Sequence, residues 1–346
     1  MIQKISNFSR KEPTFSILLT VLIVVIVLLS IFLGDQFFSF NNIQSMAYQI
    51  PEFAFLALAM SITMLTGGID LSIITNANLA AILAGFVLTG RVFGPESGLS
   101  EAAIVAIAVA VALMSATTGG VINGLLIGKM SVPPILATLG TMIFFDGVSM
   151  AITGGRGVVG FPDLFLRLGT DAPGGVPVIF ILILSVLAII PFVMSRTPFG
   201  RSVYLLGENR IASLFAGVKN EQVTLKVYAL SGLLVGFAAI IIASRVNSAK
   251  VGYGDTYLLQ AILVAVLGGI SPNGGRGKVI NVMLGVLILQ MLQSAFTLFA
   301  FSPYAKRLIF GFMLLLVMVV NYYLEKIQSR SQFTQPSLET QPEAAK

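Results

Sequence analysis

Residues 66–75, TGGIDLSIIT, place a carboxylate and a hydroxyl directly after two glycines within an otherwise apolar region. An ionised Asp costs roughly 2.5–3.5 kcal/mol at the centre of a spanning helix, so Asp70 is expected at a cavity, a helix end or a turn. Two structures fit. In one, a helix broken at Gly67 and Gly68 lines a polar route with Asp70 and Ser72. In the other, a tight turn precedes a helix that Asp70 caps.

A second stretch, residues 119–155, carries hydrogen-bonding groups on two apolar segments. The carboxamide of Asn123 and the hydroxyl of Thr138 can donate and accept hydrogen bonds to a neutral polyol. Gly120 and Gly124 have the four-residue spacing that allows helices to pack closely in lipid. The predicted translocation pathway comprises Gly67, Gly68, Asp70, Ser72, Asn123 and Thr138.

A third stretch, LGGISPNGGRGK at residues 267–278, predicts a turn or re-entrant element near the cytoplasmic face. It lacks the GxxxxGK[ST] spacing of a phosphate-binding loop, so nucleotide binding is not expected there. Glu52, beside Pro51, is interpreted as a helix-start carboxylate and not as a proton relay. The residues that define the predicted glycine-rich turn are Gly268, Gly269, Gly274, Gly275 and Arg276.

The chain contains no His and no Cys. This excludes disulfides, cysteine nucleophiles, imidazole bases and the usual zinc or haem ligand sets. We therefore expect no catalytic residues, no metal site and no cofactor.

Composition indicates a polytopic helical membrane protein. Of 346 residues, 56% are hydrophobic and only 10% are charged, which lies outside the range of soluble domains. A single permease domain is predicted over residues 1–327, followed by a disordered cytoplasmic tail at 328–346, whose apolar content is too low to offset the entropy lost on ordering. Ten spans are expected, at 14–34, 46–66, 70–89, 101–127, 132–152, 176–194, 226–245, 256–270, 278–299 and 305–324.

The long polar loop at residues 195–226 sets the orientation. It holds five basic and two acidic residues, which is typical of a cytoplasmic loop. With ten spans, both termini are then cytoplasmic, and most Lys and Arg lie inside. The net charge of +6 reflects this topology and does not indicate nucleic-acid binding. Within the loop, Asn209 is expected to cap a short helix that ends at Gly217.

Four stretches together resemble one family, the membrane permeases of ribose-type sugar ABC importers, within the branched-chain amino acid and ribose permease superfamily. They are GGIDLS (67–72), VPPILATLGTM (132–142) leading to TGG, TPFGRSVYLLGENRIASLFAG (197–217) and AVLGGISPNGGRG (265–277). One departure is that Ile73 and Ile74 stand where the family commonly has Val-Gly.

The resemblance implies an all-α bundle of about ten helices, like the vitamin-B12-importer (type II) ABC permeases. It also implies a second permease subunit, two cytoplasmic ATPase subunits and a periplasmic sugar-binding protein. The family's ATPase-docking loop matches residues 197–217. The resemblance therefore implies a role in coupling to the ATPase for these residues: Gly200, Arg201, Gly207, Asn209, Ala212 and Gly217.

The expected function is translocation of a monosaccharide (ribose-, galactose- or xylose-like) or a related small polyol across the bacterial inner membrane, with ATP hydrolysed by a separate subunit. An alternative is an ion-coupled secondary transporter, which needs an intramembrane carboxylate such as Asp70 or Asp146. Asp146 could equally pair with a basic neighbour. A membrane enzyme would need a nucleophile-base pair or an acidic metal motif, and neither is found.

Overall fold

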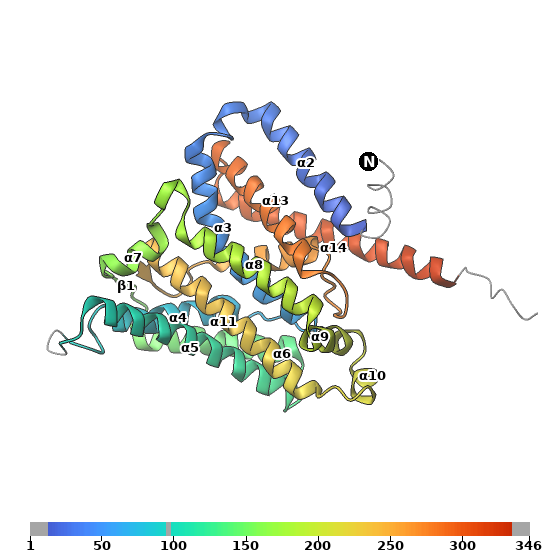
Figure 1. Ribbon diagram of the computed structural model, residues 1–346, viewed down its shortest axis with the longest axis horizontal. Coiled ribbons are helices and arrows are strands. Elements are labelled where there is room, and N and C mark those ends of the chain that lie inside the picture. Colours follow the sequence, from blue (N-terminus) through green and yellow to red (C-terminus); the bar gives the residue numbers. More distant parts are fainter. Residues whose placement is uncertain (1–12, 95–97, 334–346) are drawn as a thin grey trace, which may run out of the picture.

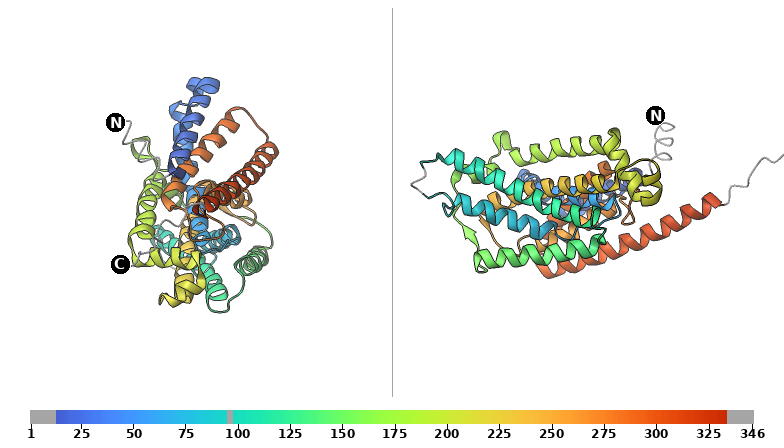
Figure 2. Two further views of the ribbon diagram at one scale, coloured as in Figure 1. Left: turned by 90° about the vertical axis from the view of Figure 1, so that its right-hand side faces the viewer. Right: turned by 90° about the horizontal axis from the view of Figure 1, so that it is seen from below.

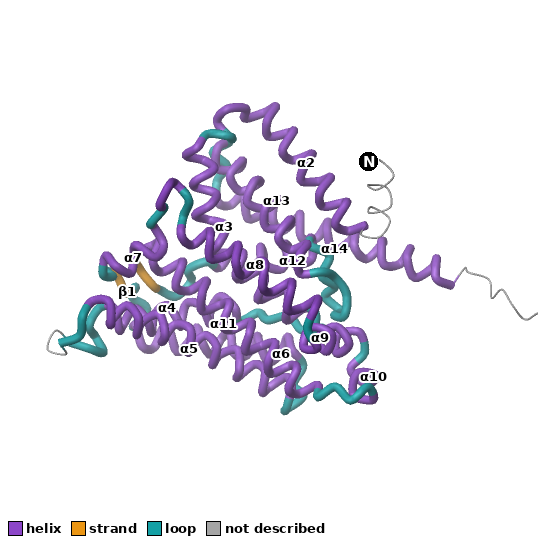
Figure 3. The backbone as a smooth tube through the Cα atoms, viewed as in Figure 1, coloured by secondary structure: helices purple, strands orange, loops and turns teal. Residues whose placement is uncertain are grey.

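The computed structural model describes residues 13–94 and 98–333, and almost all of this part of the chain is helical (Figures 1 and 3). The elements are α2 (Pro13–Leu33), η1 (Gly34–Gln36), α3 (Phe40–Met64), α4 (Ile73–Leu88), α5 (Glu101–Gly128), α6 (Pro134–Thr153), β1 (Val158–Val159), α7 (Asp163–Thr170), η3 (Pro173–Gly175), α8 (Val178–Arg196), α9 (Pro198–Glu208), α10 (Arg210–Phe215), α11 (Asn220–Val246), β2 (Ser248–Ala249), α12 (Asp255–Leu267), α13 (Val279–Leu298) and α14 (Pro303–Phe333).

Among the described residues, eight helices are long and apolar enough to cross a membrane: α2, α3, α5, α6, α8, α11, α13 and α14. The other two predicted spans correspond to α4 and α12, which have 16 and 13 residues. Both are shorter than the ~20 residues of a full span. The predicted span at 70–89 began too early and the one at 256–270 ended too late, because residues 70–72 and 268–270 are not helical.

The core of the bundle is formed by α3 and α11. In their most apolar windows, 78% and 72% of the residues are buried, against 11% for α2 and 6% for α14. α9 and α10 lie at one end of the molecule, whereas α7 and β1 lie at the other (Figure 1). Here β1 pairs with β2, with Val158 opposite Ala249.

α5 packs against α11 without intervening side chains. A Cβ at Gly120 would overlap the carbonyl oxygen of Tyr228, and a Cβ at Gly124 would lie 2.9 Å from the Cα of Leu225. From the other side, a Cβ at Gly232 would overlap the carbonyl oxygen of Ala116. The close-packing role predicted for Gly120 and Gly124 is confirmed.

Glu52 does not lie at a helix start, so that interpretation was wrong. It is buried in the interior of α3, because α3 begins at Phe40, ahead of the predicted span. Its carboxylate is paired with the Arg245 guanidinium of α11 and accepts a hydrogen bond from the Tyr257 hydroxyl at 2.5 Å. A charge buried among apolar helices needs such partners. The network ties α3, α11 and α12 together.

The end of the described chain bears on the predicted tail. α14 continues to Phe333, so residues 328–333 of the predicted tail are helical. The remainder of that tail, 334–346, lies outside the described residues, as do the basic residues at positions 4, 10 and 11.

We predict that Gly120→Ala lowers the midpoint of thermal unfolding of the purified permease, because the new methyl group forces α5 away from α11. Gly140→Ala is the matched control, since a Cβ at this α6 position meets no atom within 4 Å. Its midpoint should stay the same or rise, because Ala has the higher helix propensity. Equal effects of the two substitutions would contradict the packing described for α5 and α11.

Candidate functional site

The predicted coupling loop folds into two short capped helices. The Thr197 hydroxyl accepts a hydrogen bond from the Gly200 amide at 3.2 Å and starts α9. The side-chain oxygen of Asn209 accepts from the amides of Ile211 and Ala212, both at 2.9 Å, and starts α10. Gly217 follows α10 with a φ of +80°, the left-handed conformation that ends helices. The capped helix predicted from Asn209 to Gly217 is confirmed.

A polar pair fixes α10 to the start of α11. The buried Ser213 hydroxyl donates to the side-chain oxygen of Asn220 at 2.9 Å, and the Asn220 amide group donates to the Arg210 carbonyl at 2.8 Å. The sequence analysis missed this pair. Its only signal was a Ser and an Asn seven residues apart on either side of Gly217.

The opposite side of α10 is apolar and exposed. Ile211, Leu214 and Phe215 are 69%, 62% and 87% exposed, and we call them the α10 apolar face. Ala212 and Arg201 are also exposed, whereas Gly200 is buried against the backbone of Met194 in α8. Three large apolar side chains held on a fixed helix form a surface suited to a protein partner.

Three stretches far apart in sequence meet at backbone contacts that we call the glycine junction, comprising Leu65, Gly67, Gly207, Gly274 and Gly275. The Gly275 amide donates to the Leu65 carbonyl at 2.9 Å. A Cβ at Gly207 would overlap that same carbonyl, and a Cβ at Gly274 would lie 2.6 Å from the Gly67 nitrogen. The end of α3, the end of α9 and the glycine-rich turn are therefore locked together.

The remaining residues of the glycine-rich turn hold it against neighbouring helices. A Cβ at Gly268 would lie 3.0 Å from the Val282 nitrogen of α13, and one at Gly269 would lie 2.6 Å from the Thr14 side chain of α2. Arg276 pairs with Glu208 of α9 at 3.5 Å, but both side chains are exposed, so this ion pair stabilises little.

The predicted pathway residues Asp70, Ser72, Asn123 and Thr138 are all buried. The Asp70 carboxylate accepts from the Ser72 amide at 3.0 Å and from its hydroxyl at 2.7 Å. The Asn123 amide group donates to the Ser72 hydroxyl at 2.8 Å and accepts from Thr141 at 2.7 Å. Thr138 donates to the Ile69 carbonyl at 3.0 Å. Together these residues form what we call the polar cluster.

The connection between α3 and α4 is a turn between two separate helices. α3 ends at Met64 and α4 begins at Ile73, and Asp70 binds the Ser72 amide just before α4, close to the capping alternative. Gly68 is required here because a Cβ would overlap the Tyr228 hydroxyl of α11.

Two further ionisable side chains are Asp146 on α6 and Tyr204 on α9. Asp146 is half-buried on α6 and lies close enough to Asp255 of α12 to repel its negative charge. The positive charge of Arg307 on α14 instead stabilises the Asp255 carboxylate. On α9, burial raises the pKa of the Tyr204 phenol. Within residues 13–94 and 98–333, no group of three acidic side chains could hold a metal ion.

Apolar spanning helices, a rigid helical hairpin outside them and a glycine-locked connection between the two define a multi-pass membrane permease. The chain belongs to the family described as branched-chain amino acid transport system / permease component, whose model matches residues 42–318. It is accordingly a multi-pass protein of the bacterial inner membrane.

Several named relatives match over most of their length. The chain is 35% identical to the ribose import permease protein RbsC of Escherichia coli K12, over 87% of this chain and 92% of that protein. It is 33% identical to RbsC of Haemophilus influenzae, over 88% and 91%. It is 32% identical to the autoinducer 2 import system permease protein LsrC of Klebsiella pneumoniae, over 80% and 77%. No solved structure matches significantly.

We predict that Gly207→Ala accelerates hydrogen exchange at the Gly275 amide, because the new methyl group separates α9 from Leu65 and breaks the Gly275–Leu65 hydrogen bond. Mass spectrometry of peptides covering residues 271–277 measures this. Gly217→Asn is the control, because this position has open space and Asn tolerates its positive φ. Unchanged exchange in the Gly207 variant would refute the tight contact.

Proposed function

We propose that the chain is the permease subunit of an ATP-binding-cassette importer that carries a monosaccharide or a related small polyol. The observation that carries this proposal is the α9–α10 hairpin. It presents an exposed apolar face on one side and joins the transmembrane bundle through the glycine junction on the other. The names of the ribose and autoinducer 2 permeases support the importer class.

The proposed assembly contains a second permease subunit, two cytoplasmic ATPase subunits and a periplasmic sugar-binding protein, all around the lipid bilayer. Ten spans, with α4 and α12 as short members, form a type II bundle with both termini cytoplasmic. The orientation is supported by Thr14 at the start of α2, which touches the glycine-rich turn. The end of α14 also extends from the molecule on the side of α9 and α10 (Figure 2).

The coupling follows from the rigidity of the contacts. Closure of the ATPase subunits would push on the α10 apolar face and move α9 with it. At Gly207 the backbone of α9 meets that of Leu65 and Gly275 without flexible side chains between them, so little of the movement is absorbed. The α3–α4 turn and its polar cluster would shift, which opens or closes the route beside Asp70, Asn123 and Thr138.

The ion-coupled alternative gains little from Asp70. Its carboxylate already accepts hydrogen bonds from Ser72 and lies near the Asn123 amide, so the native structure supplies its partners without a bound cation. Sugar uptake by vesicles that contain the permease, an ion gradient and no ATPase would favour the alternative instead.

We predict that Phe215→Ser weakens ATPase binding at least about tenfold, because a large aromatic residue is lost from the centre of the contact. The measurement is co-purification of the ATPase with the membrane-inserted permease, followed by titration of the two. Since Phe215 is 87% exposed, the fold should be unaffected. Val92→Ser, an exposed apolar position in the loop before α5, should bind the ATPase normally. Normal ATPase binding by the Phe215 variant would sink the docking proposal.

We predict that Asn123→Leu reduces sugar uptake by the assembled complex. The substitution leaves the hydroxyls of Ser72 and Thr141 without their Asn123 partner, and the cost is about 1–3 kcal/mol. Uptake into proteoliposomes is compared with the yield of the complex, which separates transport from folding. Asn78→Leu, a buried amide on α4 outside the polar cluster, serves as control. Unchanged uptake in the Asn123 variant would remove this residue from the pathway.

A further inference from the structure

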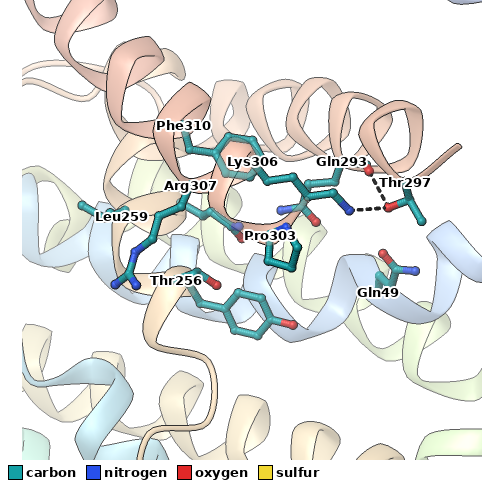
Figure 4. Close-up of a pocket in the computed structure, with 11 residues that line it drawn as sticks. Gln49, Thr256, Leu259, Gln293, Thr297, Pro303, Lys306, Arg307 and Phe310 are labelled. Atoms are coloured by element: carbon teal, nitrogen blue, oxygen red, sulfur yellow. Dashed lines mark hydrogen bonds between the residues drawn. The ribbon is translucent and has the colours of Figure 1, made fainter. Parts of the chain in front are cut away.

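A cavity of about 270 Å³ lies between α3, α12, α13 and α14 (Figure 4). We call it the glutamine cavity. It forms where α13 ends and α14 begins, whereas the glycine-rich turn joins the opposite ends of α12 and α13. The cavity is therefore on the side of the bundle away from the glycine junction, which is the outer side in the proposed topology.

Carboxamides, hydroxyls and cationic groups line the cavity, together with two aromatic rings. Its lining includes no Asp or Glu among the described residues. The Gln49 side-chain oxygen accepts from Gln290 at 3.1 Å. The Lys306 ammonium donates to the Thr297 hydroxyl at 2.9 Å, as Figure 4 shows. The lining includes Gln49, Thr256, Tyr257, Gln260, Gln293 and Phe310.

Two carboxamides of the lining have unmet hydrogen bonds. Within the described part of the chain, the Gln260 side-chain oxygen and the Gln293 side-chain nitrogen are buried and have no partner. Gln260 as a whole is only 5% exposed. Each buried group without a partner destabilises the fold by about 1–3 kcal/mol, and Leu of similar volume would avoid this cost. Both side chains belong to the lining of the cavity.

The chemistry of these groups selects the ligand. A hydroxyl donates and accepts hydrogen bonds, so neighbouring hydroxyls of one solute can satisfy Gln260 and Gln293 together. The rings of Tyr257 and Phe310 offer apolar surface to the C–H face of such a solute. Asp255 lies near Arg307 and offsets part of the positive charge that Arg307 and Lys306 bring to the lining. The volume is just below that of sites for drug-sized ligands, which suits a single sugar ring.

We propose that the glutamine cavity is a binding subsite for a neutral, monosaccharide-sized polyol on the outer half of this chain. The inference rests on the proposed importer function and adds a location and a ligand class to it. In contrast with the polar cluster, whose groups bond to one another, the cavity has hydrogen-bonding groups left for a solute.

Thiol labelling tests occupancy without requiring transport. The chain has no Cys, so Thr256→Cys gives it one thiol, at an exposed position on the cavity lining. The complex in proteoliposomes is treated with a small methanethiosulfonate reagent, with and without millimolar D-ribose, D-xylose or D-galactose. At least one sugar should slow labelling several-fold, and gluconate should not. Val92→Cys, exposed in a loop outside the cavity, should label at the same rate throughout.

Paired substitutions, each combined with Thr256→Cys, then separate binding from structure. Gln260→Leu and Gln293→Leu each remove a group without a partner, so thermal stability should be unchanged or higher. Sugar protection of the introduced thiol and sugar uptake should both fall about tenfold, the loss expected when a neutral hydrogen bond to a ligand is removed. Asn78→Leu also removes a buried amide with an unmet hydrogen bond, but outside the cavity, and should leave protection and uptake unchanged.

The outcomes are distinguishable. Failure of the wild-type complex to import any of the three sugars overturns the proposed function. Normal import without sugar protection of the introduced thiol, or with protection by gluconate alone, overturns the glutamine cavity as a polyol subsite and leaves the importer assignment standing. Lower stability together with full protection in the glutamine variants would show that these residues are structural, which also overturns the subsite.

Discussion

The structure depends on the glycine junction, where three backbone segments are in contact with no side chain between them. At the glycine junction, the Gly275 amide binds the Leu65 carbonyl and Gly207 leaves no room for even a methyl group. Glycine is required at Gly274 and Gly275 for a second reason, because both have positive φ values of +88° and +69°. Because no flexible side chain lies between α9 and the end of α3, displacement of the α9–α10 hairpin must move the transmembrane bundle.

The surrounding bundle is rigid for related reasons. Lipid provides no hydrophobic force between helices, so close backbone packing and interhelical hydrogen bonds hold them. α5 and α11 supply the first through Gly120 and Gly232, and the polar cluster supplies the second by linking the α3–α4 turn to α5 and α6. The Glu52–Arg245 pair fixes the middle of α3 to the end of α11. A hairpin attached to such a unit can transmit force to it.

Local features of this architecture could be predicted from the sequence, and contacts between distant segments could not. The cap at Asn209 and the end at Gly217 depend on a few adjacent residues, and they were predicted. The apolar runs predicted the spanning helices, but hydropathy does not mark where a turn shortens α4 or α12. Each glycine-rich stretch was recognised separately, but no local pattern shows that Gly67, Gly207 and Gly274 touch. Arg245 was missed because its partner lies 193 residues away.

Two groups of polar side chains, the polar cluster and the glutamine cavity, have different physical consequences. In the polar cluster, Asp70, Ser72, Asn123 and Thr141 satisfy one another, so a solute must compete with existing hydrogen bonds to reach them. In the glutamine cavity, the Gln260 oxygen and the Gln293 nitrogen have no partner, so a polyol that reaches these atoms displaces none of their hydrogen bonds. In the proposed importer, a solute therefore meets free hydrogen-bonding groups at the glutamine cavity before it reaches the polar cluster, whose own hydrogen bonds must rearrange before the solute can pass.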